Sequence, residues 1–327
     1  MKPECVDARL PRAMDWRLKA GIQKVLELVP GGGRIHQLMQ VKAGALSKFG
    51  DECDGRVDDW ALMMGHLRKT NVPVSGAIMA EIGTGWYPAL PFCFYLAGAG
   101  RIHTYDLYRH VTPRMVNALA ARLPIYASRI AEASGEREEA VRARQAGLQA
   151  ALGRGASILE ATAGVVRYEA PADATRTGLD DGSVDVLFSN AVLQHIPGPI
   201  VEDCLREAFR ILKPGGVTVH AVNCGDQYAY ADRRVHQLNY LRYSETAWRK
   251  WNNRFTYQNR LRAIDFTDMA KRAGFALELD TSTVHPERLR QLDEMTIDPM
   301  FTARYTREQL ALTTIDFVGR KTTQARA

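Results

Sequence analysis

Residues 80–88 read AEIGTGWYP, and this stretch decides the fold of the chain. A short apolar run, residues 76–79, precedes it, and the apolar segment LPFCFYLAGAG follows at 90–100. This order predicts a strand, a tight glycine turn and a helix. Gly83 and Gly85 lack a Cβ, so the backbone there can adopt a positive φ and approach a ligand closely. The helix that follows offers free N–H groups and the positive end of its dipole, which suit a carboxylate or a phosphate.

The glycine turn departs from the dinucleotide-binding fingerprint. That fingerprint has three glycines, in the order G-x-G-x-x-G after a strand. Here two glycines are followed by Trp86, Tyr87 and Pro88, which argues against a pyrophosphate pressed onto the helix. Taken alone, the turn fits an ordinary strand-to-helix connection equally well.

Two later stretches carry polar residues at the ends of apolar runs. Asp106 lies 25 residues after Glu81 and closes the second run, where a carboxylate can accept hydrogen bonds from a ribose diol. Residues 182–196, GSVDVLFSNAVLQHI, predict a buried strand that ends in Ser189 and Asn190. The turn EAFRILKPGG and a further apolar strand at 217–222 follow.

In this order the motifs resemble those of the class I S-adenosylmethionine-dependent methyltransferases, of the broad methyltransferase 11 or 25 type. The features that carry the resemblance are the E-I-G-T-G loop, the acid after the second strand, the run D-A-T-x-x-x-L-D-D-G-S-V-D-V and the turn L-K-P-G-G. The resemblance implies a doubly wound α/β sheet of seven mostly parallel strands, Rossmann-like, with an antiparallel final strand. It also implies that S-adenosylmethionine binds at the strand ends.

The resemblance assigns the parts of this cofactor to particular residues. The methionine carboxylate would meet the loop amides, Asp106 would hold the ribose, and Asp173 would meet the adenine amine. Asp173 is equally plausible as a turn cap. Tyr87 replaces the family's third glycine, so the aromatic side chains are expected to shape the methionine pocket. The expected cofactor-binding residues are Glu81, Gly83, Thr84, Gly85, Trp86, Tyr87, Asp106, Leu107, Asp173, Ala174, Ser189 and Asn190.

Candidates for catalysis and acceptor binding follow the fourth and fifth strands. His195 can act as a general base near neutral pH, or can simply line the cleft. Residues 224–266 are dense in aromatic and basic side chains and should pass over the cleft, where aromatic faces suit a sulfonium cation. The alternative is that the tryptophans there are core residues. Tyr228 is the second catalytic candidate, and the substrate candidates are Asp226, Tyr230, Trp248, Arg254 and Arg260.

Two helical additions accompany the expected sheet. Periodic segments at 15–28, 34–49 and 58–70 predict an N-terminal helical cap over residues 1–75, which either lies across the cofactor mouth or covers one sheet edge. The catalytic domain would then span 76–327. A helical insertion at about 112–160 would form a lid, a dimerisation element or a plain surface excursion.

Composition bounds the class of protein. The chain has 327 residues, 46% apolar and 24% charged, with no apolar run near the ~20 residues of a membrane span and no signal peptide, so we expect a cytoplasmic enzyme. The five cysteines are scattered without a C-x-x-C pair, which predicts free thiols and no metal site. Despite a net charge of +6, basic clusters are interrupted by glutamates, so a nucleic-acid partner is not favoured. A homodimer is a candidate assembly.

The sequence therefore predicts in-line methyl transfer from S-adenosylmethionine to an O, N or C atom of a small-molecule acceptor. One alternative is a non-methylating enzyme that uses the same cofactor for cyclisation or another group transfer and releases methylthioadenosine. The other is a catalytically silent protein that binds the cofactor without turnover.

Overall fold

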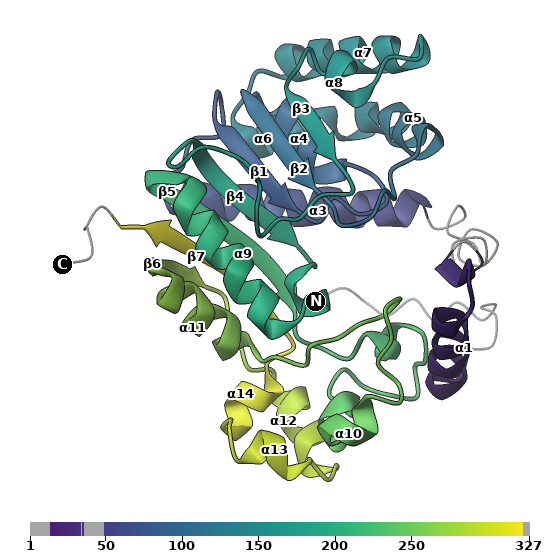
Figure 1. Ribbon diagram of the computed structural model, residues 1–327. Coiled ribbons are helices and arrows are strands. Elements are labelled where there is room, and N and C mark those ends of the chain that lie inside the picture. Colours follow the sequence, from purple (N-terminus) through teal and green to yellow (C-terminus); the bar gives the residue numbers. More distant parts are fainter. Residues whose placement is uncertain (1–13, 34, 36–48, 323–327) are drawn as a thin grey trace.

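The computed structural model describes residues 14–33, 35 and 49–322. Its centre is a sheet of seven strands in the order β3-β2-β1-β4-β5-β7-β6 (Figure 1). All neighbouring strands pair in parallel except β7, which runs antiparallel to both β5 and β6. This confirms the predicted doubly wound sheet with a reversed final strand. The strands are β1 (Ile78–Ile82), β2 (Arg101–Tyr105), β3 (Val166–Glu169), β4 (Val184–Asn190), β5 (Leu212–Asn223), β6 (Phe275–Asp280) and β7 (Thr314–Lys321).

Helices cover both faces of the sheet and form two hydrophobic cores (Figure 1). One face carries α9 (Gly198–Ile211) and α11 (Ala263–Ala273). The other face carries α3 (Phe49–Lys69), the longest helix among the described residues, and α4 (Ala89–Leu96), which follows the glycine turn. The helices of the insertion cover the same face. They are α5 (Pro113–Arg122), η2 (Leu123–Tyr126), α6 (Ala127–Ser134), α7 (Glu138–Gly153) and α8 (Ile158–Ala161).

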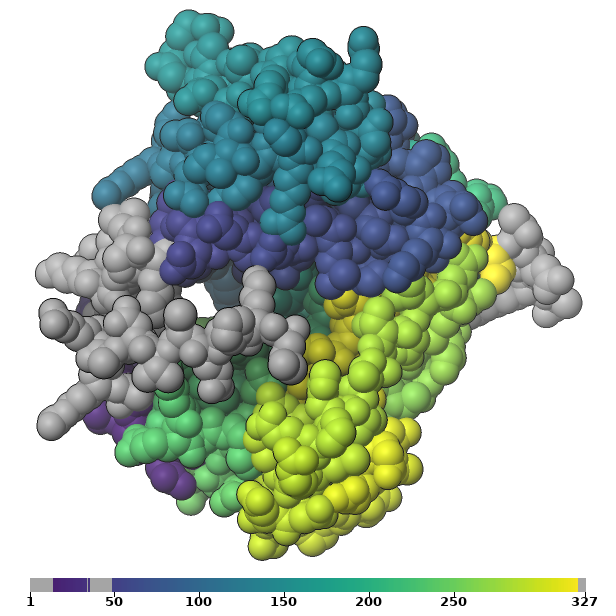
Figure 2. All heavy atoms as spheres, turned by 180° about the vertical axis from the view of Figure 1, so that it is seen from behind, coloured from purple at the N-terminus to yellow at the C-terminus, as the bar shows by residue number. Residues whose placement is uncertain are grey.

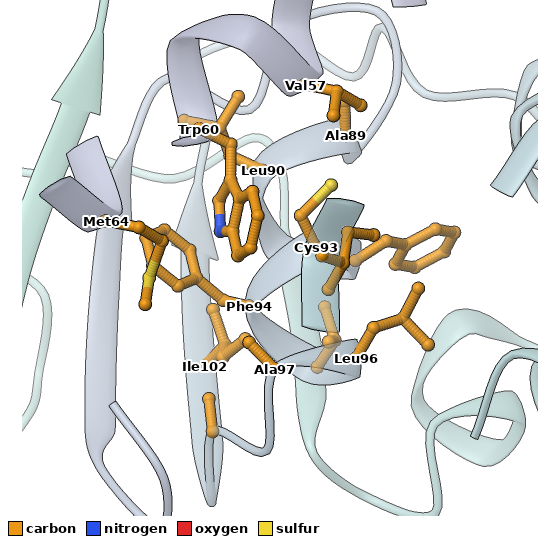
Figure 3. Packing of buried hydrophobic residues seen from close by; sticks show 14 of the residues in the cluster. Val57, Trp60, Met64, Ala89, Leu90, Cys93, Phe94, Leu96, Ala97 and Ile102 are labelled. Atoms are coloured by element: carbon orange, nitrogen blue, oxygen red, sulfur yellow. The ribbon is translucent and has the colours of Figure 1, made fainter. Parts of the chain in front are cut away.

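Helix α3 is part of the packing of the sheet. Figure 3 shows Trp60 and Met64 of α3 facing Cys93 and Phe94 of α4. The ring of Phe94 lies 5.9 Å from Trp60 and 4.8 Å from Phe188 of β4, so one aromatic chain links α3 to the sheet. The helix predicted at 58–70 begins nine residues earlier, at Phe49, because the apolar spacing continues through Cys53 and Val57, both buried. The helix predicted at 34–49 lies almost wholly outside the described residues.

A smaller subdomain packs beside the carboxyl ends of the strands. It comprises residues 225–262 and 281–313, here named the C-terminal subdomain, and α1 (Trp16–Leu28) packs on it. Trp16 lies at the centre of that contact, with ring centroids 5.4 Å from Tyr228 and 6.4 Å from Trp248. Thus α1 and α3 pack on different parts of the molecule. The subdomain's elements are η4 (Gln227–Tyr230), η5 (Asn239–Arg242), α10 (Glu245–Trp248), α12 (Pro286–Asp293), α13 (Pro299–Thr302) and α14 (Arg307–Ala311).

A histidine is buried inside the sheet. His220 of β5 is 0% exposed, with Nδ1 2.7 Å from the Ser189 hydroxyl and Nε2 2.6 Å from the Thr218 hydroxyl. Burial lowers the pKa of His220 to about 3, because no carboxylate compensates the loss of water around the charged ring. The folded protein therefore holds this imidazole neutral.

This burial predicts a pH-dependent loss of stability. An unfolded histidine takes up a proton near pH ~6.5, whereas folded His220 stays neutral. The contribution of His220 therefore lowers the free energy of unfolding by about 1.4 kcal/mol for each pH unit below that value. The free energy of unfolding, measured by urea denaturation from about pH 6.5 to about pH 4.5, should fall less steeply in His220→Leu than in the wild type. His285→Leu, at an exposed histidine, is the control. Equal slopes in wild type and His220→Leu would contradict the assignment.

Candidate functional site

The carboxyl ends of β1, β2 and β4 face an opening between α3 and the C-terminal subdomain. Seen from behind, the surface is hollowed between the blue-violet α3 and the green part of the subdomain (Figure 2). The two glycines of the predicted turn lie here, with φ of 82° at Gly83 and 73° at Gly85. Both angles are in the left-handed region that favours glycine.

The two glycines serve different purposes. A Cβ on Gly83 would lie 2.5 Å from Cγ2 of Val192, so the turn there is pressed against the segment after β4. A Cβ on Gly85 would meet no atom within 4 Å. Gly83 is thus required by packing, while Gly85 borders open space into which a ligand can approach the backbone.

Asp106 joins the end of β2 to the glycine turn. Its Oδ2 accepts a hydrogen bond of 2.8 Å from the Gly85 N–H, and its Oδ1 accepts one of 3.0 Å from the Tyr108 N–H. The carboxylate is half-buried, and each oxygen keeps lone-pair capacity for a further donor. Asp106 is therefore fixed in place beside the glycine turn and keeps acceptor capacity for a further donor.

Glu81 lies deeper, beneath the turn. Its side chain is 3% exposed and accepts a hydrogen bond from the Thr104 hydroxyl, which also contacts the Thr84 hydroxyl. Burial raises the pKa of Glu81 to about 8, although Thr104 and the charge of Arg56 oppose the shift. The carboxyl group is thus neutral at pH ~7 and ties β1 to β2. Its role is to support the turn from below.

The two aromatic residues after the glycines point in different directions. Tyr87 is buried, donates a 3.1 Å hydrogen bond to Oε2 of Glu52, and has its ring 5.4 Å from Phe49. Tyr87 therefore belongs to the packing against α3. Trp86 is half-buried beside the loop after β2, with its ring 4.8 Å from the imidazole of His110. The expectation that both aromatic side chains shape one ligand pocket is thus corrected, because Tyr87 is a core residue.

The loop after β3 lies against the loop after β2, since the Ala172 N–H donates 2.9 Å to the Asp106 carbonyl. Asp173 is exposed, and its Oδ1 accepts from the N–H and hydroxyl of Thr175 at 2.9 and 2.8 Å. The Thr175 backbone bond is the main cause of the lowered pKa of Asp173. The side chain acts as a turn cap, and Ala174 beside it is half-buried. Leu107 is 61% exposed at the opposite loop.

The two polar residues that end β4 lie on opposite sides of the sheet. Ser189 is 0% exposed and bonded to His220, so its side chain does not face the opening, contrary to expectation. Side chains alternate along a strand, and Ser189 falls on the α9 side. Asn190 donates a 2.8 Å hydrogen bond to Oδ2 of Asp59 on α3. Helix α3 thus supplies a carboxylate at the strand ends.

His195 belongs to η3 (Leu193–His195), the turn after β4, and is exposed. Its Nδ1 lies 2.6 Å from the carbonyl oxygen of Tyr257. A carbonyl only accepts, so Nδ1 carries the hydrogen and the lone pair of the neutral ring is on Nε2. Desolvation by the surrounding protein lowers the pKa of His195, and the Tyr257 carbonyl partly opposes this. The geometry and the pKa both suit a general base.

Four further candidates lie inside the C-terminal subdomain, which corrects the expectation that they contact substrate. Tyr228 is 0% exposed and its hydroxyl donates 2.9 Å to the Trp251 carbonyl. Trp248 is 1% exposed within an aromatic cluster. Asp226 is 0% exposed, caps η4, and has its pKa raised to about 6 by burial. Arg260 is 5% exposed and donates to the Glu245 carboxylate at 2.6 Å.

The remaining two candidates are exposed. The hydroxyl of Tyr230 accepts from Asn223 at 2.7 Å and from Gln237 at 3.1 Å. Arg254 borders a pocket of about 290 Å³ between α1 and the subdomain.

Sequence reasoning missed two residues of this region, Asp59 and Val192. Asp59 lies inside a predicted helix, but no local signal tells which strand end a helix side chain will reach. Val192 follows β4, and its contact with Gly83 depends on the pairing of β1 with β4.

Part of the chain matches a known protein family. Residues 143–220, which run from α7 to β5, match the model of the methyltransferase domain family. The chain is 32% identical over 127 residues to an arsenite methyltransferase of Aquipseudomonas alcaligenes, covering 39% of this chain and 32% of that protein. It therefore spans about a third of the length of this relative.

Solved structures resemble this chain at low identity. A geranyl diphosphate C-methyltransferase of Streptomyces coelicolor has a TM-score of 0.47 and 12% identity, covering 81% of this chain and 79% of that one. A methyltransferase of Methanosarcina mazei has a TM-score of 0.45 and 12% identity, covering 76% and 94%. One of Mesorhizobium loti has a TM-score of 0.42 and 15% identity, covering 78% and 96%.

Within residues 14–33, 35 and 49–322, no group of three or more His, Cys, Asp or Glu side chains could hold a metal ion. No helix among the same residues is long and apolar enough to cross a bilayer.

The contrast between Gly83 and Gly85 gives a matched test of stability. Gly83→Ala should lower the free energy of unfolding in two ways. Backbone strain at the left-handed φ costs about 1–2 kcal/mol, and overpacking against Val192 costs about 1–3 kcal/mol. Gly85→Ala should cost the strain alone. Urea denaturation should therefore show the larger loss for Gly83→Ala, partly recovered when Val192→Ala is added. Equal losses in the two alanine variants would contradict the packing described.

Proposed function

We propose that this protein transfers the methyl group of S-adenosylmethionine to a small-molecule acceptor. The observation that supports this most directly is the Asp106 carboxylate, held by the Gly85 N–H beside a turn with open space around it. S-adenosylmethionine supplies an electrophilic methyl group on a sulfonium sulfur. The protein's own task is to bind, orient and exclude water.

The described residues fit the parts of that cofactor in turn. The open side of the turn at Gly85 suits the methionine carboxylate, and the free lone pairs of Asp106 suit the ribose hydroxyls. The adjoining loops that carry Leu107 and Ala174 would flank the adenine. Of the two residues that end β4, only Asn190 has its side chain on the α3 side, where it donates to Asp59.

Methyl transfer requires the acceptor atom in line with the sulfonium, at about 3–3.5 Å from the methyl carbon. A hydroxyl or ammonium acceptor must also lose a proton. We assign this step to His195, whose Nε2 lone pair is available because Nδ1 donates to the Tyr257 carbonyl. Tyr228 is too deeply buried to take this role.

The acceptor of the arsenite methyltransferase is not favoured here. Arsenic(III) is a soft centre that binds thiolates, so an arsenite site should hold accessible cysteines. Cys5 lies outside the described residues. Cys53, Cys93, Cys204 and Cys224 are all buried, and burial raises their pKa values to about 11 or 12. Since none of these four described cysteines is accessible, we propose an O, N or C acceptor.

Calorimetric titration with S-adenosylhomocysteine tests cofactor binding. The wild type should bind, and Asp106→Ala should bind about 10- to 100-fold more weakly, because hydrogen bonds to a charged group contribute about 1.5–3 kcal/mol. Asp268→Ala, at an exposed carboxylate on α11, is the control and should bind normally. Absence of binding to the folded wild type would overturn the proposal.

The product of turnover separates the alternatives. Release of S-adenosylhomocysteine with a methylated acceptor supports methyl transfer. Release of methylthioadenosine would instead indicate a non-methylating group transfer. Binding without any product across a broad acceptor screen would indicate a silent binding protein.

The role of His195 predicts a particular pH dependence. Because its pKa is lowered, the neutral base persists to a more acidic pH, so the acid limb of kcat/KM should lie below ~6.5. His195→Gln should lose this acid limb, and its kcat should fall by about 10²- to 10⁴-fold. Its affinity for S-adenosylhomocysteine should be unchanged. An unchanged acid limb in the variant would exclude His195 as the base.

A further inference from the structure

A pocket of about 290 Å³ lies between α1 and the C-terminal subdomain. Its volume is at the lower end of the ~300–1,000 Å³ typical of small-molecule sites. The pocket is lined by polar residues from three segments: Glu27 of α1, Glu245 and Arg249 at α10, and the run Asn252, Asn253, Arg254, Tyr257, Gln258 and Asn259.

The carboxylates of the pocket are already engaged. Glu245 pairs with Arg260 at 2.6 Å, and Glu27 pairs with Lys24 at 3.0 Å and accepts from the Arg254 N–H at 3.2 Å. In contrast, Arg249 and Arg254 form no ion pair within residues 14–33, 35 and 49–322. The pocket thus presents two guanidinium groups that have no ion-pair partner among the described residues, while its two carboxylates are engaged elsewhere.

Arginine is suited to oxyanions. Its planar guanidinium can donate two parallel hydrogen bonds to a carboxylate or phosphate. The guanidinium carbon of Arg254 lies 4.9 Å from the centre of the Phe255 ring, a contact that limits the side chain's freedom before any ligand arrives. This favours binding, because less rotamer entropy remains to be lost.

The wall of the pocket is rigid. Asn252 and Gln258 exchange hydrogen bonds of 3.1 and 2.9 Å between side chain and backbone. Gln258 is 3% exposed and also accepts from the Gln227 N–H at 2.9 Å. Asn253, 2% exposed, donates to the Tyr228 hydroxyl at 3.1 Å. The pocket is therefore a built feature of the subdomain.

The same wall is attached to the turn that carries His195. The Tyr257 carbonyl contacts His195 at 2.6 Å, and the Asn259 side chain donates to the carbonyls of Leu193 and Ile196, both at 2.8 Å. The pocket is thus held next to the strand ends, where the methyl group would be presented.

A second, smaller cavity shares Gln258 and Asn259 with the pocket. It has a volume of about 10 Å³ and is also lined by Gln194 and by Asn223, Cys224 and Gly225 at the end of β5. The side chain of Gln194 is 5% exposed, and its Oε1 has no hydrogen-bond partner in the described chain. Buried polar atoms are normally paired, and a cavity of this size has room for about one water molecule.

We propose that the pocket binds the oxyanionic group, a carboxylate or a phosphate, of the methyl acceptor, with Arg249 and Arg254 as its partners. This inference rests on the proposed methyl transfer. The acceptor extends from the two arginines past Gln258 and Asn259 and presents its nucleophilic atom toward His195. The substrate class is thus a small anionic molecule with a hydroxyl or amino group remote from its charge.

Binding of simple oxyanions to the full chain tests the pocket without turnover. Inorganic phosphate and glutarate are titrated into the protein saturated with S-adenosylhomocysteine and followed by calorimetry. Saturable binding of at least one is expected, and its identity distinguishes phosphate from carboxylate. Arg249→Ala and Arg254→Ala should each weaken it at least about fivefold, and the double variant should abolish it, with the affinity for S-adenosylhomocysteine unchanged. Arg254→Lys should retain part of the binding.

Arg233→Ala, at an exposed arginine of the same subdomain that does not line the pocket, is the control. Failure of both anions to bind while S-adenosylhomocysteine binds would overturn the anionic-acceptor assignment and leave methyl transfer standing. Failure of S-adenosylhomocysteine to bind would overturn the proposed function and, with it, the acceptor role of the pocket. Normal anion binding in the double variant would place the anion elsewhere and overturn the inference.

Discussion

The 2.8 Å hydrogen bond from the Gly85 N–H to the Asp106 carboxylate is the interaction on which the site depends. It joins the loop after β1 to the loop after β2, and it is possible only because Gly85 adopts a positive φ. Beneath it, the neutral carboxyl group of Glu81 and the hydroxyls of Thr84 and Thr104 hold the same two strands together. The turn is therefore supported from within the sheet, and its outer side is left open.

Two regions of the molecule contribute to the site around this hydrogen bond. The sheet and its helices supply the rigid strand ends, whereas the C-terminal subdomain supplies a polar pocket next to His195. The subdomain is built from an aromatic cluster around Trp248, together with arginines that donate to backbone carbonyls and buried oxygens. Such a core tolerates the charge of Arg262 because its two terminal nitrogens donate to backbone carbonyls and to the Tyr240 hydroxyl, although its Nε has no partner among the described residues.

This construction explains which parts of the site could be predicted from sequence. The glycine turn and Asp106 are local features tied to strand ends, so the motifs and the sheet topology located them together. The aromatic and basic residues at 224–266 gave no such guidance, because Trp248 and Arg260 suit a cleft lining or a compact core equally well. Ser189 was expected to face the opening, but its side chain lies on the opposite, α9 side of the sheet. Successive side chains of a strand alternate between the two faces, and the local sequence does not tell which face of β4 packs against which helices. Asp59 was missed since it reaches the site through the tertiary packing of α3.

Helix α3 also bears on how the fold could be divided. It begins beside the glycine turn, where Glu52 receives the hydroxyl of Tyr87, and ends at β7, where His66 lies 2.8 Å from Asp316. Between these points Trp60, 0% exposed, completes the aromatic packing over β4. A fragment beginning at residue 76 would therefore leave one face of the sheet without part of its cover. The smallest fragment that keeps this face of the sheet covered therefore includes the helix that precedes the first strand, so a transfer of the sheet to another protein would have to include α3.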